Sequence, residues 1–173
     1  GGNGADYLNG GAGDDAMSGG DGDDIYVVDS TSDTVTEDPS KGTDLIYSSV
    51  SFTASADVEN LTLTGSNNID ATGNILNNIL RGNSGNNTLT GDDGDDKLFG
   101  NNGNDTLDGG DGADYLNGGA GDDAMSGGDG NDSYVVDSTS DTVTEDPSKG
   151  TDLIISSVSF TASADVENLT LTG

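Results

Sequence analysis

The sequence predicts an all-β fold in which short parallel strands stack as a β-solenoid. Three observations predict it: a nine-residue repeat, an apolar residue at one fixed position of the repeat, and glycines at the positions between the expected strands. A turn, a short strand, a second turn and a second strand make one coil, which therefore contains two repeats. Each coil can then pair its strands with those of the next coil.

The nine-residue unit occurs in two uninterrupted runs. The first run reads GGNGADYLN, GGAGDDAMS and GGDGDDIYV, from Gly1 to Val27. The second run has six copies, from Gly82 to Val135, and its third and fourth copies read GNNGNDTLD and GGDGADYLN. Residues 1–65 recur as residues 109–173 with four differences, so a long period, equal to twelve nonapeptides, is superimposed on the short one.

Position 8 of the nonapeptide is always apolar and its neighbours are mostly polar. This pattern predicts a three-residue strand with one side chain pointing inward. Glycine at positions 1, 2 and 4 allows backbone angles that other residues avoid, and it lets a turn approach a ligand or a neighbouring turn closely. The inward residues are Leu8, Met17, Tyr26, Leu89, Leu98, Leu107, Leu116, Met125 and Tyr134.

Composition shows that this chain lacks the usual sources of stability. Hydrophobic residues are only 29% of the chain, and burying one apolar side chain per nonapeptide does not offset the entropy of ordering nine residues. There is no cysteine for disulfides or thiolate metal sites, and no histidine for zinc sites or a catalytic triad. With 33 acidic residues against four basic ones, the net charge is −29, which disfavours nucleic acid and anionic membranes as partners. A bound cation is the expected missing component.

Position 6 supplies ligands for such a cation. It is aspartate in every repeat except one, where Asn87 replaces it. Residues two repeats apart lie on the same edge of the solenoid, about 4.8 Å apart, so their carboxylates repel unless a hard dication lies between them. All-oxygen ligands with adaptable geometry favour calcium over magnesium. The expected side-chain ligands are Asp6, Asp15, Asp24, Asn87, Asp96, Asp105, Asp114, Asp123 and Asp132, together with Asp33 and Asp141, which keep the same frame just after each run.

Backbone carbonyls of the glycine-rich turns are expected to complete each calcium shell. For the Asp6–Asp24 pair they belong to Gly1, Asn3, Gly20 and Gly22. For the Asp96–Asp114 pair they belong to Gly91, Asp93, Gly110 and Gly112. For the Asp105–Asp123 pair they belong to Gly100, Asn102, Gly119 and Gly121. For the Asp114–Asp132 pair they belong to Gly109, Asp111, Gly128 and Gly130. The repeat that carries Asn83 and Asn87 departs from the pattern, which predicts a weak site between Asn87 and Asp105.

These nonapeptides resemble the RTX (repeats-in-toxin) family, whose GGxGxDxLx repeats bind calcium. The resemblance covers nine repeats, or 81 of the 173 residues. It implies a right-handed parallel β-roll with calcium between successive turns. It also implies secretion from bacteria by a type I system in an unfolded state, followed by folding outside the cell.

The spacer between the two runs is expected to continue the solenoid with calcium-poor rungs. The stretches "TDLIYSSVSFT" and "VENLTLTG" alternate as strands, and Pro39 and Gly42 mark a turn. The predicted segments are therefore a roll at 1–27, a β spacer at 28–81, a second roll at 82–135 and the start of a second spacer at 136–173. A separate small β domain in the spacer is the alternative, although its core would be meagre.

The sequence therefore favours a structural, non-enzymatic calcium-binding segment of a secreted bacterial surface protein of adhesin type. The chain begins and ends within its own pattern, so we expect it to be a piece of a longer protein. Two alternatives are the calcium-dependent secretion tail of an enzyme or toxin, and a subunit of an extracellular filament or lattice that assembles with itself or with neighbouring repeats. No membrane insertion is expected, because no apolar run approaches about 18 residues. A flexible linker would not keep a period of nine, and an EF-hand loop would need a glutamate that the runs lack.

Overall fold

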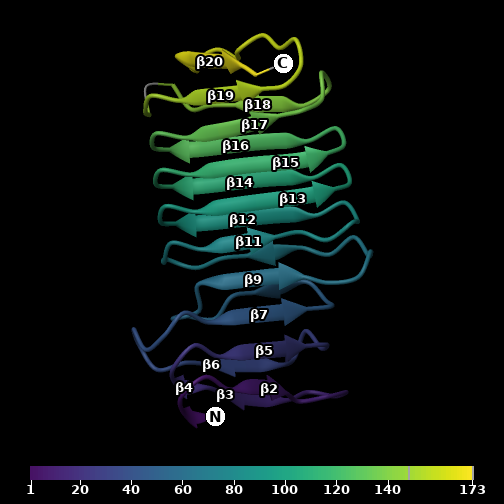
Figure 1. The fold of residues 1–173 in the computed structure, drawn as a ribbon, viewed down its shortest axis with the longest axis vertical. Coiled ribbons are helices and arrows are strands. Elements are labelled where there is room, and N and C mark those ends of the chain that lie inside the picture. Colours follow the sequence, from purple (N-terminus) through teal and green to yellow (C-terminus); the bar gives the residue numbers. More distant parts are fainter. Residues whose placement is uncertain (148, 173) are drawn as a thin grey trace.

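The computed structural model describes residues 1–147 and 149–172, and these form a parallel β-solenoid (Figure 1). Its coils stack in sequence order from the N-terminus to the C-terminus. Every strand pairing among the described residues is parallel, so the prediction of an all-β solenoid is confirmed. Within the described part of the chain, no helix is long and apolar enough to cross a membrane.

One face of the solenoid is a continuous sheet of ten strands. It includes strands from both nonapeptide runs and from the spacer, which confirms that the spacer continues the solenoid and argues against a separate domain. The strands pair in the order β2 (Tyr7–Asn9), β5 (Ile25–Val28), β7 (Leu45–Ser48), β9 (Asn60–Leu63), β11 (Ile79–Arg81), β13 (Lys97–Asn102), β15 (Tyr115–Ala120), β17 (Ser133–Val136), β19 (Leu153–Ser156) and β20 (Asn168–Leu171).

The opposite face is divided into two sheets. β3 (Ala16–Ser18) pairs with β6 (Thr34–Thr36), and among the residues described here no pairing joins β6 to the next strand on this face, β8 (Phe52–Thr53). A third, small sheet pairs β1 (Gly2–Asn3) with β4 (Gly20–Asp21) in the turns of the first coils. The six-stranded sheet has the order β18 (Thr142–Thr144), β16 (Ala124–Asp129), β14 (Thr106–Asp111), β12 (Thr88–Asp93), β10 (Ala71–Thr72) and β8 (Phe52–Thr53).

The register follows the nonapeptide in the runs and departs from it in the spacer. Lys97 pairs with Tyr115, two repeats further on, as the two-repeat coil predicts. Between β5 and β11 the coils are irregular, because Ile25 pairs with Leu45, Leu45 with Asn60, and Asn60 with Ile79. The first and third of these coils are longer than two repeats and the second is shorter. Together they equal three standard coils, so the nine-residue frame is restored at β11.

The core is a column of apolar side chains between the two faces. Position 8 supplies it, as predicted: Tyr26, Leu98 and Leu116 are fully buried, and Leu8 packs against the cluster at its end. Spacer residues continue the same column, because Ile46, Leu61 and Leu80 pair with one another and with position 8 of the flanking coils. In the six-repeat run each strand therefore contributes one apolar side chain to the core, such as Leu98 from the ten-stranded sheet and Leu107 from the opposite face.

Two expectations about strands need correction. The first five strands of the six-repeat run are six residues long rather than three, because pairing extends into the turn, as in Asp93 with Asp111, and the last strand, β17, has four residues. The stretch "TDLIYSSVSFT" forms two strands on opposite faces rather than one. The chain turns between β7 and β8, where the Ser48 hydroxyl donates to the Val50 carbonyl and accepts from the Val50 N–H.

Candidate metal centres

The position-6 residues form two columns, one at each edge of the solenoid. Each of them directly precedes a strand, and the strands of the two faces start at opposite edges (Figure 1). Asp6, Asp24, Asp96, Asp114 and Asp132 precede strands of the ten-stranded sheet. The other column, before strands of the opposite face, contains Asp15, Asp33, Asn87, Asp105, Asp123 and Asp141.

Backbone hydrogen bonds link neighbouring members of each column. In every predicted pair, the backbone N–H of the first residue donates to Oδ1 of the residue one coil further on. The N···O distances are 2.6 Å for Asp6–Asp24, 2.7 Å for Asp96–Asp114, 2.8 Å for Asp105–Asp123 and 2.8 Å for Asp114–Asp132. The structure thus brings the predicted pairs together and satisfies one oxygen of each second carboxylate.

The other carboxylate oxygen is buried without a partner. Within the described part of the chain, Oδ2 has no hydrogen bond in Asp6, Asp15, Asp24, Asp96, Asp105, Asp114, Asp123 and Asp132. A buried, unpaired anionic oxygen costs several kcal/mol unless a cation neutralises it. Eight such atoms along two columns therefore indicate sites for cations.

Burial also changes the acidity of these carboxyl groups. Desolvation raises the pKa of Asp96 and Asp114 to about 7, and that of Asp123 and Asp132 to about 6. The pKa of Asp105 is raised for the same reason. Hydrogen bonds from backbone N–H groups oppose these shifts without cancelling them.

The glycine at position 1 leaves space beside each unpaired oxygen. A methyl group added at Gly91, Gly100 or Gly109 would lie within 3.0 Å of Oδ2 of the aspartate in the same repeat. It would also lie within 3.0 Å of the carbonyl oxygen of the position-1 glycine one coil on, for example Gly127 opposite Gly109. A carboxylate oxygen and a carbonyl oxygen thus surround one small volume, which suits a hard cation.

The predicted carbonyl ligands differ in which side chain they face. The Gly109 carbonyl faces the space beside Asp96, whereas the Gly91 and Gly100 carbonyls face Asn78 and Asn87. Three carbonyls that were not predicted, those of Gly19, Gly118 and Gly127, face Asp6, Asp105 and Asp114. Of the other predicted positions, eight lie in paired strands, four in bends and one at the N-terminus: Asn3, Gly20, Asp93, Asn102, Asp111, Gly110, Gly119 and Gly128 in strands, Gly22, Gly112, Gly121 and Gly130 in bends, and Gly1 at the terminus. Their role as ligands stays a prediction.

Where asparagine stands at position 6, the chain satisfies its side chain internally. The Asn87 amide oxygen accepts from the Asn83 N–H at 2.8 Å, and its amide nitrogen donates to the Ile69 carbonyl at 2.6 Å. Asn78 makes the corresponding bonds with the Asn74 N–H and the Glu59 carbonyl. The amide NH₂ group thus takes the place of Oδ1, and the oxygen that faces the Gly100 carbonyl already accepts from the Asn83 N–H, which supports the expectation of a weak site at Asn87.

Asp33 and Asp141 differ from the other predicted ligands. Oδ1 of Asp33 accepts from the Asp15 N–H, and Oδ2 accepts from the N–H groups of Asp29 and Ser30. The Asp15 N–H contributes most to a lowered pKa at Asp33. Asp141 makes the equivalent three bonds. Backbone donors thus satisfy both oxygens of these two carboxylates, and their assignment as metal ligands stays a prediction.

Sequence reasoning missed four acidic residues of the first column. The Asp24 N–H donates to Asp44 Oδ1 at 2.8 Å, and the Asp44 N–H donates to Glu59 Oε2 at 2.8 Å. In the second copy, Asp152 and Glu167 make the same bonds. Because one coil here is longer than two repeats and the next is shorter, a search at intervals of two repeats does not find them. The signal available in the sequence was an acidic residue directly before a strand, since Asp44 precedes Leu45 and Glu59 precedes Asn60.

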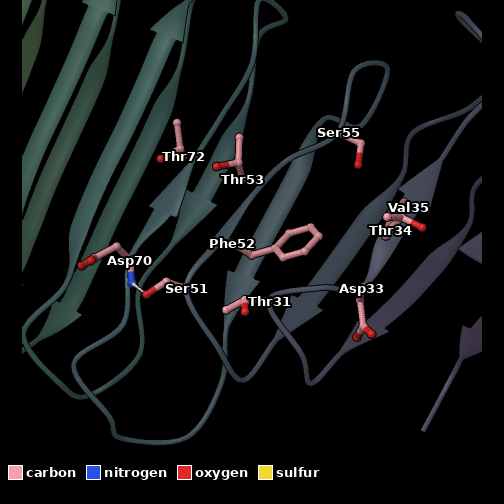
Figure 2. A pocket seen from close by; sticks show the side chains of 10 residues that line it. All are labelled: Thr31, Asp33, Thr34, Val35, Ser51, Phe52, Thr53, Ser55, Asp70 and Thr72. Carbon is pink, nitrogen blue, oxygen red and sulfur yellow. Dashed lines mark hydrogen bonds between the residues drawn. The ribbon is translucent and has the colours of Figure 1, made fainter. Parts of the chain in front are cut away.

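The gap between β6 and β8 forms a cleft of about 470 Å³ next to Asp33 (Figure 2). Thr34, Ser51, Phe52 and Thr53 line it, together with Asp70 from the following coil. A matching cleft of about 420 Å³ lies beside Asp141 in the second copy. Since backbone donors already satisfy the Asp33 carboxylate, this cleft does not have the unpaired oxygens of the two columns.

A parallel β-solenoid with columns of buried, unpaired carboxylates defines a repeat protein that binds hard cations. The family model for the RTX calcium-binding nonapeptide repeat matches residues 1–35, 72–107 and 99–134. These matches cover more than half of the chain, and the chain belongs to this family. The comparison with curated proteins gave no match.

Calcium is the ion that the family binds, and the residues present fit it. The unpaired Oδ2 atoms supply negative charge, and the neighbouring position-1 carbonyls supply neutral oxygens. When bound, calcium neutralises the buried carboxylates and joins one coil to the next. Backbone N–H groups of the preceding coil donate to Oδ1 and leave Oδ2 available for an ion in six of these aspartates, namely Asp24, Asp96, Asp105, Asp114, Asp123 and Asp132.

Proposed function

We propose that this chain is a structural, non-enzymatic segment of a secreted bacterial surface protein of adhesin type, and that it folds when it meets calcium outside the cell. The observation that carries the proposal is the set of buried Oδ2 atoms without partners. In their ionised form they oppose folding, and a calcium ion that binds only the folded chain reverses this effect.

The calcium requirement supports an extracellular role. Calcium modules of extracellular proteins bind with dissociation constants of about 0.1 to 1 mM. Sites of that strength are filled in an external medium and stay empty in a cytosol poor in calcium. The chain would therefore remain unfolded before export, and calcium would act as the signal that export has occurred.

The continuity of the solenoid supports a role as a spacer on the cell surface. The spacer coils restore the nine-residue frame, so one block of twelve nonapeptide lengths follows another without a break in the ten-stranded sheet. Further blocks could be added by the same geometry, and each would lengthen the molecule along its axis. This arrangement suits an extended surface protein better than a compact tail on an enzyme.

A calcium titration followed by circular dichroism tests the proposed folding. We expect strand signal to appear between about 0.1 and 1 mM calcium, and magnesium at the same concentration to produce little. Folding at micromolar calcium or below, or a spectrum that does not respond, would contradict the proposal. Antibodies against the chain, applied to intact and to lysed cells of the source bacterium, test its location: labelling only after lysis would exclude a surface role.

A further inference from the structure

Two buried acidic clusters lie where each nonapeptide run meets its spacer. Each cluster joins an aspartate of the first column to two spacer residues, with one oxygen of each residue within 4.8 Å of the others. Asp24, Glu37 and Asp44 form the first cluster, with exposures of 1%, 7% and 2%. Asp132, Glu145 and Asp152 form the second.

Glu37 stands where the nonapeptide would have its position-1 glycine. It directly follows VDSTSDTVT, the last stretch that keeps the nine-residue frame. In the runs, the carbonyl oxygen of the position-1 glycine faces Oδ2 of the aspartate one coil earlier. At the junction, Oε1 of Glu37 enters this space instead, because an added methyl group at Gly19 would lie within 3.0 Å of both Glu37 Oε1 and Asp24 Oδ2. A charged oxygen thus replaces a neutral one.

The unpaired oxygen of Asp24 points into this cluster. Asp24 is almost completely buried, and its Oδ2 has no hydrogen-bond partner among the described residues. Glu37 is held in place from the other side, since its Oε2 accepts from the Gly20 N–H at 3.0 Å. Asp132 has the same unpaired Oδ2 in the second copy.

Tyrosine replaces leucine or methionine at position 8 beside each cluster. The hydroxyl of Tyr26 is buried and donates to Glu37 Oε1, and Tyr134 donates to Glu145 Oε1 in the same way. A smaller apolar side chain would fill the core position without reaching the junction. The hydroxyl therefore adds a fourth oxygen to three carboxylates.

No basic side chain in the described part of the chain neutralises either cluster. Among these residues, the ion pairs are Lys41–Asp21 and Lys149–Asp129, and all four side chains are exposed. Three buried carboxylates so close together would repel strongly. Four hard oxygens that carry this much negative charge match calcium.

We propose that Asp24, Glu37 and Asp44, and likewise Asp132, Glu145 and Asp152, each bind one calcium ion that joins a nonapeptide run to its spacer. These junction sites differ from those between nonapeptides, because two of their three carboxylates come from the spacer. The inference rests on the proposed function only for its choice of ion.

Ion counting by native mass spectrometry at saturating calcium tests the junction sites. We expect Glu37→Gln to bind one ion fewer than the unmodified chain, and Glu37→Gln with Glu145→Gln to bind two fewer. Glutamine keeps the size of the side chain and can still accept from the Gly20 N–H. The control pair Asp38→Asn and Asp146→Asn removes the same charge from the adjacent exposed residues, and its ion count should not change. An unchanged count in the glutamine variants would overturn the inference.

Terbium luminescence gives a second test, which does not depend on the folding of an acidic variant. Terbium replaces calcium, and a tyrosine in contact with the ion sensitises its emission. We expect Tyr26→Phe with Tyr134→Phe to lose most of the sensitised emission, whereas Tyr7→Phe with Tyr47→Phe, at exposed positions, should retain it. Full emission from the first pair would exclude an ion at the junction. Failure of the proposed function would look different, because the dichroism of the unmodified chain would then not respond to calcium.

Discussion

At the scale of single residues, the difference between aspartate and asparagine at position 6 decides where calcium is needed. Both side chains have the same shape, but the amide can donate to a backbone carbonyl and the carboxylate cannot. Asn87 accordingly has both of its side-chain groups paired within the chain, while Asp114 has one oxygen unpaired among the described residues. The nonapeptide sequence predicted this difference, because the residue type at position 6 is visible without a structure.

Replacement of one column aspartate should weaken calcium binding. Asp114→Asn removes a buried carboxylate that lies between Asp96 and Asp132. At a calcium concentration ten times the dissociation constant, each lost site costs about 1.4 kcal/mol of stability. Calcium-dependent unfolding in urea measures this loss. The exposed Asp108→Asn is the control, and equal behaviour of the two variants would contradict the assigned role of Asp114.

Position 1 requires glycine because of crowding at the ion site. Gly109→Ala would place a methyl group within 3.0 Å of Asp114 Oδ2 and of the Gly127 carbonyl. We expect at least one ion fewer and a loss of roughly 1 to 3 kcal/mol. Gly13→Ala is the control for the ion count, since no atom lies within 4 Å of the added methyl group there. Its φ of 132° strains alanine, so only the ion counts of the two variants are compared. Calorimetric ion counting should show a loss only for Gly109→Ala, and full binding by that variant would rule out this explanation.

At the scale of strands and coils, the sequence predicted the regular part of the solenoid and missed the irregular part. The two-repeat register follows directly from the nonapeptide, so Asp96, Asp114 and Asp132 were placed correctly on one edge. The spacer coils are longer or shorter than two repeats, and their lengths depend on turns whose geometry local residue preferences do not determine. For that reason Asp44 and Glu59 were not recognised as members of the same column.

The asparagine coils should become calcium sites when a carboxylate is restored. Asn87→Asp replaces the amide that donates to the Ile69 carbonyl with an acceptor that needs a cation. We expect one additional calcium ion in native mass spectra, because Asp105 already lies one coil further on. Asn67→Asp adds the same charge at an exposed position and should bind no extra ion. If Asn87→Asp folds and its ion count stays the same, the account of the asparagine coils is wrong.

At the scale of the whole molecule, calcium binding and protonation compete for the same buried carboxylates. Burial raises the pKa of Asp96 and Asp114 to about 7. A raised pKa means that the folded chain binds more protons than the unfolded chain. In the absence of calcium, this contribution to stability is therefore complete at acidic pH and is lost as the pH rises through about 6 to 7. With calcium the dependence is reversed, because the ion needs ionised ligands.

This competition predicts that calcium displaces protons near neutral pH. At pH 6, where protonated carboxyl groups favour the compact chain without calcium, we expect calcium binding to release protons. At pH 8 the calcium-free chain is unfolded and its carboxyl groups are already ionised, so we expect much less release. Titration calorimetry in buffers with different ionisation enthalpies measures the number of protons released. Equal release at both pH values would show that the column carboxylates do not bind the ion.

The size of the chain in solution with and without calcium tests the central claim most directly, namely that calcium ions between coils replace the core that this chain lacks. Small-angle scattering at neutral pH measures it. After complete removal of calcium, we expect a radius of gyration near that of an unfolded chain of this length, about 44 Å. At millimolar calcium the radius should fall to less than about half of that value, as expected for a stacked solenoid. A chain that stays equally compact at neutral pH after calcium is removed would contradict the account.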